Sequence, residues 1–287
     1  MNRLLLFFAL LLFADGFAQQ ADFLKIGRYR VAYLNDSLKE NSGLSFRNGR
    51  LYVMNDGGNS SEIFEIDKSS GKILKTIKTG LTNIDWEAIA SDSLYFYTGD
   101  FGNNAGTRKN LKIYKIPYDN NSAAQEIPFF YPEQQDFSRK VINNDFDAEA
   151  MIVLNGKIHV FTKEWVSKST THYVLNPELA DNQPAEKTES FRTGFVVTDA
   201  AYFDGKLFLI GYTKNTEVFL SVFKESEPGV FFSKQPKKYY LGSSLSVGQI
   251  EGIAVDESGV YISGEEFRTP FGTAKQAFYF IPADKIL

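Results

Sequence analysis

A pattern that recurs five times along the chain constrains its fold more than any other sequence feature. Each copy begins with an acidic or hydroxyl residue, passes through a small and an apolar residue to a tight turn, and ends in an apolar-aromatic run. Asn-Gly or Asp-Gly pairs at 48–49, 155–156 and 204–205 favour a hairpin between the two apolar runs. The repeat therefore predicts one β-hairpin unit used five times. The copies begin at Ser42, Glu87, Glu149, Asp199 and Glu251.

Apolar runs after each hairpin add further strands to each unit. Third strands are predicted at 63–66, 111–116, 172–175, 218–223 and 277–281, and fourth strands at 73–77, within 127–142, at 190–193 and at 238–241. The fifth unit ends without a fourth strand, but residues 28–34 near the N-terminus form an unassigned strand. Pairing it with the last unit would close a ring and remove an exposed sheet edge. We therefore predict an all-β fold, a β-propeller of five four-stranded blades closed by an N-terminal strand. The alternative is six blades, with the additional blade around residues 125–144.

The first 18 residues have the features of a signal peptide. Arg3 precedes an apolar run at 4–13 that is too short to span a bilayer, and Gly16 and Ala18 are the small residues that signal peptidase requires. We expect cleavage after Ala18, a single propeller domain over 19–287, and no membrane span in the mature chain. A short membrane anchor is the alternative. The chain has no cysteine to carry a lipid, so we expect a secreted or periplasmic protein.

The composition of the chain excludes several classes of binding site and catalytic site. The net charge of −4 gives no basic excess for nucleic acid. The absence of cysteine excludes disulfides, thiolate metal sites and cysteine nucleophiles. With only two histidines, His159 and His172, a multi-histidine metal centre or a Ser-His-Asp triad is not expected. An exported chain without disulfides is stabilised by its core or by a bound metal, and extracellular calcium sites work at roughly 10⁻⁴–10⁻³ M.

The starts of the five repeats predict a metal site. The first strand of each propeller blade lines the central channel, so these residues converge at one end of it. Carboxylates about 6 Å apart repel by roughly 3 kcal/mol a pair at an effective dielectric of about 20, unless their pKa values rise or a cation lies among them. Hard oxygen ligands favour Ca²⁺. Capping of backbone amides at the strand entries is the alternative. The predicted metal ligands are Ser42, Glu87, Glu149, Asp199 and Glu251.

Loops after the second strands should surround this ring, because the first strand begins and the second ends on the same face. Their mixture of charged and aromatic residues is typical of a site for a polar ligand; a solvated loop face is the alternative. Asp85 and Asp147 precede two of the ring glutamates and join the face, whereas we expect His159 to pack inside its blade. The predicted ligand-binding residues are Asp56, Asn59, Asp100, Asn103, Lys163, Glu164, Trp165, Lys214, Glu266 and Arg268.

The segments 40–44, 55–56, 85–88, 99–104 and 251–254 together resemble a group of exported bacterial β-propellers without established activity. A more distant resemblance is to the calcium-activated nucleotidases (apyrases), which are five-bladed propellers with a central Ca²⁺ held by Ser and Glu at strand starts. That resemblance implies calcium ligation by Ser42, Glu87, Glu149 and Glu251. Asp199 stands where a hydroxyl residue is expected, and the nucleotide-contacting loops have no counterpart. Gluconolactonase-like propellers also hold a central divalent cation.

These features support three functional hypotheses for what we expect to be a monomer. The first is a calcium-binding protein that presents its loop face to a glycan, a peptide, a small anion or an extracellular partner. The second is a Ca²⁺-dependent phosphohydrolase in which Lys163 and Arg268 neutralise phosphate and Glu87 or Asp100 acts as base. The third is a lactone or ester hydrolase.

Overall fold

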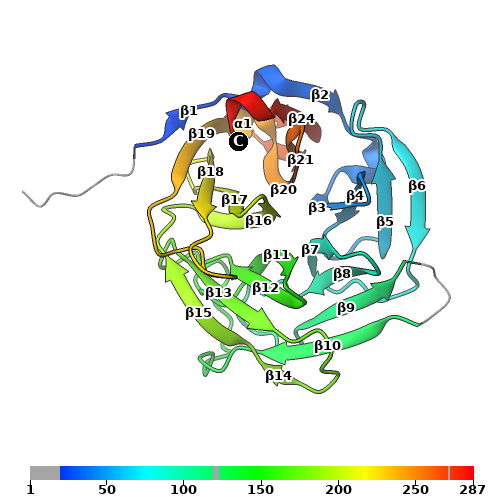
Figure 1. Ribbon diagram of the computed structural model, residues 1–287, viewed down its shortest axis with the longest axis vertical. Coiled ribbons are helices and arrows are strands. Elements are labelled where there is room, and N and C mark those ends of the chain that lie inside the picture. Colours follow the sequence, from blue (N-terminus) through cyan, green and yellow to red (C-terminus); the bar gives the residue numbers. More distant parts are fainter. Residues whose placement is uncertain (1–19, 119–122, 271) are drawn as a thin grey trace, which may run out of the picture.

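The computed structural model describes residues 20–118, 123–270 and 272–287. It is a five-bladed β-propeller, as predicted (Figure 1). The signal-peptide prediction for residues 1–18 lies outside the described residues. Within the described part of the chain, no helix is long and apolar enough to cross a membrane.

Each blade is an antiparallel sheet of four strands, ordered from the channel outward. Blades 1 and 2 follow one another directly in sequence. Blade 1 contains β3 (Asn41–Arg47), β4 (Arg50–Asn55), β5 (Glu62–Ile66) and β6 (Ile73–Lys78). Blade 2 contains β7 (Trp86–Ser91), β8 (Tyr95–Asp100), β9 (Lys112–Pro117) and β10 (Gln125–Phe130).

Blades 3 to 5 repeat this arrangement, and the last borrows a strand from the N-terminus. Blade 3 contains β11 (Ala148–Leu154), β12 (Lys157–Thr162), β13 (Thr170–Leu175) and β15 (Glu186–Phe191). Blade 4 contains β16 (Val196–Phe203), β17 (Lys206–Tyr212), β18 (Glu217–Lys224) and β19 (Lys237–Ser243). Blade 5 contains β20 (Gln249–Asp256), β21 (Gly259–Glu265), β24 (Ala277–Pro282) and β2 (Arg30–Tyr33).

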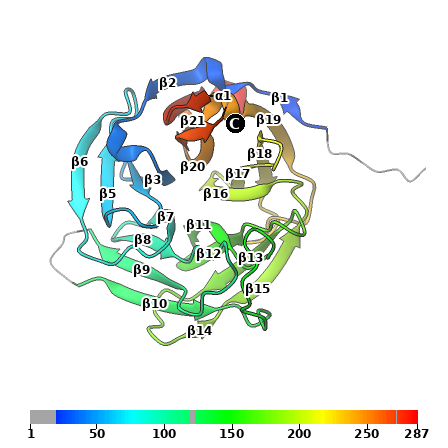
Figure 2. The same ribbon diagram turned by 180° about the vertical axis from the view of Figure 1, so that it is seen from behind.

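The ring closes as predicted, because β2 pairs antiparallel with β24 as the outer strand of blade 5. The alternative of six blades is wrong: after β10, residues 131–147 contain no strand. The fourth strand of blade 3 was predicted at 190–193, but it lies at Glu186–Phe191. Three additions were not predicted. They are β1 (Asp22–Phe23) parallel to β19, β14 (Gln183–Pro184) parallel to β10, and a hairpin of β22 (Phe267–Thr269) and β23 (Gly272–Ala274) (Figure 2).

Tight turns and interblade packing account for the arrangement. Asn48, Asn155 and Asp204 have φ values of 50°, 52° and 49°, the left-handed conformation that an Asn-Gly or Asp-Gly hairpin turn requires. The apolar core is divided into five clusters, one at each junction between neighbouring blades. Each cluster combines aliphatic side chains with several aromatic ones, which bury a large area between two sheets. Each blade is thus held by its two neighbours.

The two histidines lie inside blade 3, so the packing prediction for His159 is confirmed. The His159 and His172 side chains are 4% and 0% exposed. Nδ1 of His159 is 2.8 Å from Nε2 of His172, and Nδ1 of His172 is 3.2 Å from the Glu189 carboxylate. Burial, together with the neighbouring His172, lowers the pKa of His159 to about 4. Both histidines lie on β12 and β13 rather than on the inner strand of the blade, and they contact each other and Glu189 there.

Candidate functional site

All five inner strands, β3, β7, β11, β16 and β20, carry a β-bulge near their first residues. The pairing register with the second strand shifts there in every blade. Bulges re-aim side chains and occur often beside functional sites. The bulged residues therefore occupy equivalent positions in the five blades. In blade 1 this position is one residue after the predicted Ser42, and in blade 4 it is one residue before the predicted Asp199. The bulged residues are Gly43, Glu87, Glu149, Thr198 and Glu251.

Asp199 and Ser42 use their side chains to hold backbone groups of neighbouring strands. The Asp199 carboxylate accepts hydrogen bonds from the backbone N–H groups of Leu44 (3.2 Å) and Ile253 (2.6 Å), and from that of Ala200. It thereby joins β16 to β3 and β20 across the channel. Burial raises the pKa of Asp199, and the three N–H groups act in the opposite direction. The Ser42 hydroxyl donates to the Glu87 carbonyl at 2.7 Å. Asp199 thus binds backbone amides, whereas Ser42 binds a backbone carbonyl.

Four carboxyl groups gather where β7 and β11 begin, and we call Asp85, Glu87, Asp147 and Glu149 the acidic cluster. A methyl group built on Gly102 would lie 2.3 Å from Glu87 Oε1 and 2.5 Å from Asp85 Oδ2, so these oxygens converge on one point. Burial raises the pKa of Glu87 well above its usual value, and the charges of Glu149, Asp85 and Asp147 raise it further. Burial also raises the pKa of Asp147 to about 6, although Lys163 opposes the shift.

Lys163 supplies a cation to the acidic cluster from within the protein. Its ammonium group forms an ion pair with Glu149, and each side chain is only 4% exposed. Burial opposes the charge of Lys163, but the carboxylate of Glu149 and further acidic groups hold its pKa well above the usual value. Burial raises the pKa of Glu149, and Lys163 lowers it. The cluster thus has four carboxyl groups around one buried ammonium group.

Blades 1 and 5 contribute further acidic groups to the same end of the channel. Burial, together with the charges of Glu251, Glu40 and Asp85, raises the pKa of Asp56 to about 7. Burial, together with the charges of Glu251, Asp56 and Glu149, raises the pKa of Glu265 to about 10. Glu251 accepts hydrogen bonds from Gln249 Nε2 at 2.6 Å and Tyr212 Oη at 3.3 Å. Like charges therefore face one another around this mouth of the channel.

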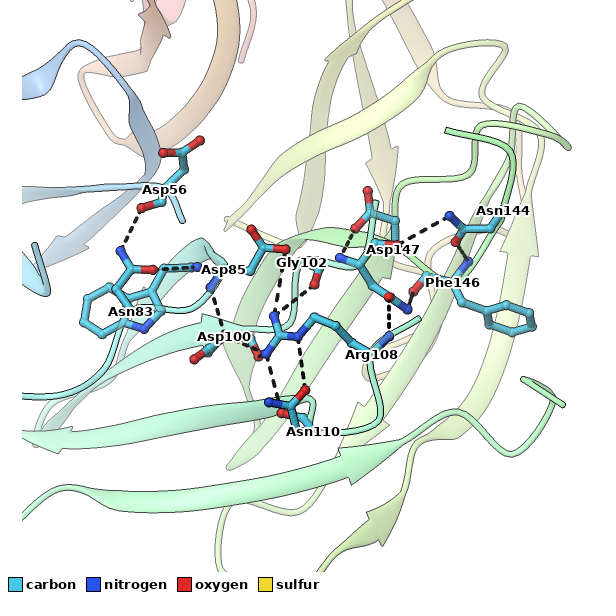
Figure 3. Close-up of polar contacts among 12 residues, drawn as sticks. Asp56, Asn83, Asp85, Asp100, Gly102, Arg108, Asn110, Asn144, Phe146 and Asp147 are labelled. Carbon is cyan, nitrogen blue, oxygen red and sulfur yellow. Dashed lines mark hydrogen bonds and ion pairs between the residues drawn. The ribbon is translucent and has the colours of Figure 1, made fainter. Parts of the chain in front are cut away.

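The loop after β8 is fixed against the acidic cluster by Arg108 and Asn103 (Figure 3). The Arg108 guanidinium pairs with Asp100 Oδ1 at 2.8 Å and donates to the Gly102 carbonyl at 2.9 Å. It lies 3.9 Å from Asp85 Oδ2. The backbone N–H of Asn103 donates to Asp147 Oδ1 at 2.5 Å. Asp100 is therefore held as an ion pair, and the loop places Gly102 where a side chain would exclude the carboxylates.

Several carboxylate oxygens of this region are buried without a hydrogen-bond partner. They are Oδ2 of Asp100, Oδ2 of Asp147 and Oε2 of Glu149. Buried polar atoms normally have a partner, so such atoms indicate a ligand, an ion or a water molecule. Over residues 20–118, 123–270 and 272–287, no three Asp, Glu or His side chains form a ready-made metal-binding group. The carboxylates approach one another, but Lys163 occupies part of the space between them.

The remaining predicted ligand residues have different environments. Asn59 donates to Glu40 and to Asp56 Oδ1, and Glu164 is buried and accepts from Thr162 and Thr171 at 2.8 and 2.6 Å. Glu266 pairs with exposed Arg268 at 2.5 Å, on the β22–β23 side of the face. Trp165 is 8% exposed, whereas Lys214 is exposed.

Sequence reasoning gave Asp85 and Asp147 no place among the metal ligands. The repeated Asp-x-Glu spacing at 85–87 and 147–149 was the available signal, because it puts one carboxylate at each bulge and a second one two residues before it. Thr198 and Gly102 were also missed. Thr198 donates to the Ile250 carbonyl at 2.7 Å and is the hydroxyl residue that blade 4 presents at the bulge. A one-residue shift in the alignment of blade 4 would have found it.

The chain matches no protein-family model and no curated protein.

Proposed function

We propose that this propeller is a binding protein whose acidic cluster holds a calcium ion and whose loop face docks a polar extracellular ligand or partner. The observation that carries the proposal is the pair of buried, unpartnered oxygens, Asp147 Oδ2 and Glu149 Oε2, beside Glu87 and Asp85. Carboxylate oxygens in an irregular arrangement suit Ca²⁺ better than Mg²⁺, which demands near-octahedral geometry. The four side chains would hold the ion, and Glu251 faces them from blade 5.

Charge balance supports this choice. Four carboxyl groups share one ammonium group. Burial raises the pKa of Glu87, Asp147 and Glu149, and the repulsion between neighbouring carboxylates adds to the shift while Lys163 opposes it. A divalent cation would remove most of this repulsion and allow the cluster to ionise. The predominance of negative charge also favours a cationic occupant over a small anion within the channel mouth itself.

Export forms part of the proposal. The sequence features of residues 1–18 support it, and calcium is available outside the cytoplasm at concentrations that match weak, open carboxylate sites. Secretion or periplasmic location, with cleavage after Ala18, is checked by the mass of the protein recovered from the culture medium or periplasm.

Thermal unfolding with Ca²⁺, Mg²⁺ and EDTA tests the metal site. At about 100 times the Kd, Ca²⁺ stabilises by roughly 2.7 kcal/mol, which raises the Tm of a domain this size by about 5–10 °C. Glu87→Gln and Glu149→Gln should remove the shift. Glu257→Gln, an exposed glutamate at the β20–β21 turn, is the matched control and should keep it. Equal melting temperatures in Ca²⁺ and EDTA for the unmodified protein would refute the proposal.

Hydrolysis is the second candidate, and the raised pKa of Glu87 favours it. A carboxyl group with a raised pKa holds a proton more readily, as a general acid beside a metal ion must. Asp100, the other predicted base, is paired with Arg108. Phosphate release from nucleoside di- and triphosphates, and hydrolysis of lactones and esters, are measured with Ca²⁺. Rates no greater than those of Glu87→Gln would exclude this candidate.

A further inference from the structure

Three lysine ammonium groups surround the indole ring of Trp165 at the junction of blades 3 and 4. Their Nζ atoms lie 5.6 Å (Lys163), 5.1 Å (Lys168) and 5.5 Å (Lys214) from the ring centroid. Lys163 comes from the start of the loop between β12 and β13, and Lys168 from its end. Lys214 comes from the loop between β17 and β18. Both loops lie on the face that surrounds the acidic cluster.

Lys163 and the other two lysines have opposite surroundings. Lys163 is buried against Glu149. Lys168 and Lys214 form no ion pair within 4.0 Å with any residue in the described ranges of the chain. Burial lowers the pKa of Lys168 and the charge of Lys214 lowers it further, with Asp145 acting against both. Two like charges thus lie together at the surface without an anion between them.

The loop that carries Trp165 and Lys168 is held in place by backbone hydrogen bonds that do not use the Trp165 indole N–H. The Asp145 carboxylate accepts from the backbone N–H groups of Val166 (2.8 Å) and Ser167 (3.1 Å). The Lys168 carbonyl accepts from the Gly194 N–H at 3.0 Å. Lys168 itself has a φ of 57°, an uncommon value that fixed surroundings must maintain. The position of the site is therefore set before any ligand binds.

Hydrogen-bond donors of Lys168 and Trp165 remain without a protein acceptor among the described residues. Lys168 Nζ donates to the Trp165 carbonyl, which uses one of its three N–H groups. Trp165 is 8% exposed, and its Nε1 is buried without a partner. An indole N–H usually finds a hydrogen-bond acceptor when it is buried. The surroundings of Trp165 therefore combine an unsatisfied donor with two uncompensated cations.

We propose that Trp165, Lys168 and Lys214 form an oxyanion-binding subsite for the carboxylate or phosphate group of a small ligand. This inference rests on the proposed function for the ligand's other contacts. Lys163 and Lys214 both contact the Trp165 ring, and Lys163 also pairs with Glu149, so the subsite lies next to the acidic cluster. The ligand would place its anionic group on this subsite and a metal-binding group over the acidic cluster. The subsite itself needs no metal.

The indole N–H signals of ¹⁵N-labelled protein test this inference. The chain has two tryptophans, so a spectrum contains two indole peaks, and Trp165→Phe assigns them. Inorganic phosphate and malonate are titrated separately at constant pH and ionic strength, with NaCl as reference. We expect a saturable shift of the Trp165 peak, and no shift of the Trp86 peak, since Trp86 is fully buried at the junction of blades 1 and 2. Saturation with only one probe identifies the oxyanion.

Variants separate the subsite from general charge effects. Lys168→Gln and Lys214→Gln should each weaken binding about tenfold, as the loss of one charged hydrogen bond does. Lys168→Arg should keep it. Lys75→Gln, an exposed lysine on β6, is the matched control. A Trp165 peak that moves linearly with salt, or that saturates in both glutamine variants with the affinity of the unmodified protein, would overturn the inference.

Titrations in EDTA and in Ca²⁺ keep the two proposals distinguishable. A saturable shift in EDTA, without any effect of Ca²⁺ on the Tm, would support the subsite and refute the calcium site. A calcium-dependent Tm with no saturable shift of the Trp165 peak would support the calcium site and refute the subsite.

Discussion

Lys163 is the residue on which the charge balance of the channel depends. A buried carboxylate is costly unless a partner compensates it, and the removal of one member of a buried ion pair leaves the other uncompensated. Lys163 has this role for Glu149, and a bound cation would reinforce or replace it. The electrostatics of the site therefore depend on one side chain from blade 3.

Lys163→Met should destabilise the metal-free protein by about 3–5 kcal/mol, the usual cost of breaking a buried pair. Calcium should recover more stability in this variant than in the unmodified protein, because the ion then supplies the missing positive charge. Urea unfolding in EDTA and in Ca²⁺ measures both effects. Lys157→Met, an exposed lysine at the start of β12, the strand that ends directly before Lys163, is the control. Equal stabilities of the two variants would contradict the prediction.

Asp56 gives the metal-free protein a pH dependence of defined sign. Its pKa in the fold is about 7, above the value of 3.8 for the free group. Its contribution to stability is complete below pH 3.8 and is lost as the pH rises through 7. Between pH 6.5 and 8.5 the ionisation of Asp56 should lower the free energy of unfolding in EDTA by about 1 kcal/mol. Glu265, with a pKa of about 10, adds a fall of the same sign. Asp56→Asn should therefore make the slope shallower by the Asp56 share, and Glu265→Gln should remove the other part. A stability that rises over this range in EDTA would show that another group dominates.

At the scale of strands and loops, the hairpins were readable from sequence and the bulges were not. The turns at Asn48, Asn155 and Asp204 follow from local backbone preference, which neighbouring residues alone determine. A bulge depends on the partner strand, so the alignment of Ser42 and Asp199 with the glutamates was offset by one position. The parallel additions β1 and β14 are also set by distant partners. For the same reason the burial of Lys163 against Glu149 could not be predicted.

The loop after β8 offers a test that changes no charge. Gly102→Ala would put a methyl group 2.3 Å from Glu87 Oε1 and 2.5 Å from Asp85 Oδ2. The carboxylates must then separate, and we expect calcium affinity to fall by at least tenfold with a smaller loss of stability. Isothermal titration calorimetry and thermal unfolding measure the two quantities. Gly27→Ala, where no heavy atom lies within 4 Å of the added methyl group, is the control. Unchanged calcium affinity in Gly102→Ala would mean that the ion lies elsewhere.

At the scale of the whole molecule, five interblade clusters and one closing strand hold the ring. The five-blade count could be predicted because each blade repeats a hairpin, and the closure because the last unit lacked a strand. Stability should therefore be cooperative around the ring, since every blade packs against two others.

A chain that begins at Asn35 lacks β2 and leaves the edge of β24 unpaired. We expect its Tm to fall by more than about 10 °C and the protein to self-associate, because an open sheet edge pairs with other chains. A chain that begins at Ile26 lacks only β1 and is the control. Thermal unfolding and size-exclusion chromatography compare the two. A monomeric, equally stable short chain would show that closure is dispensable.

Because the N-terminal strand β2 completes the C-terminal blade 5, it also determines the order in which the ring can assemble. During synthesis β2 emerges before the other strands of the five blades, yet its partner β24 is among the last segments made. The ring cannot be completed before the final blade has formed, however early the other four are in place. If the chain is exported as we propose, this delay would keep the ring open, and the chain able to pass through a membrane, until translocation has finished.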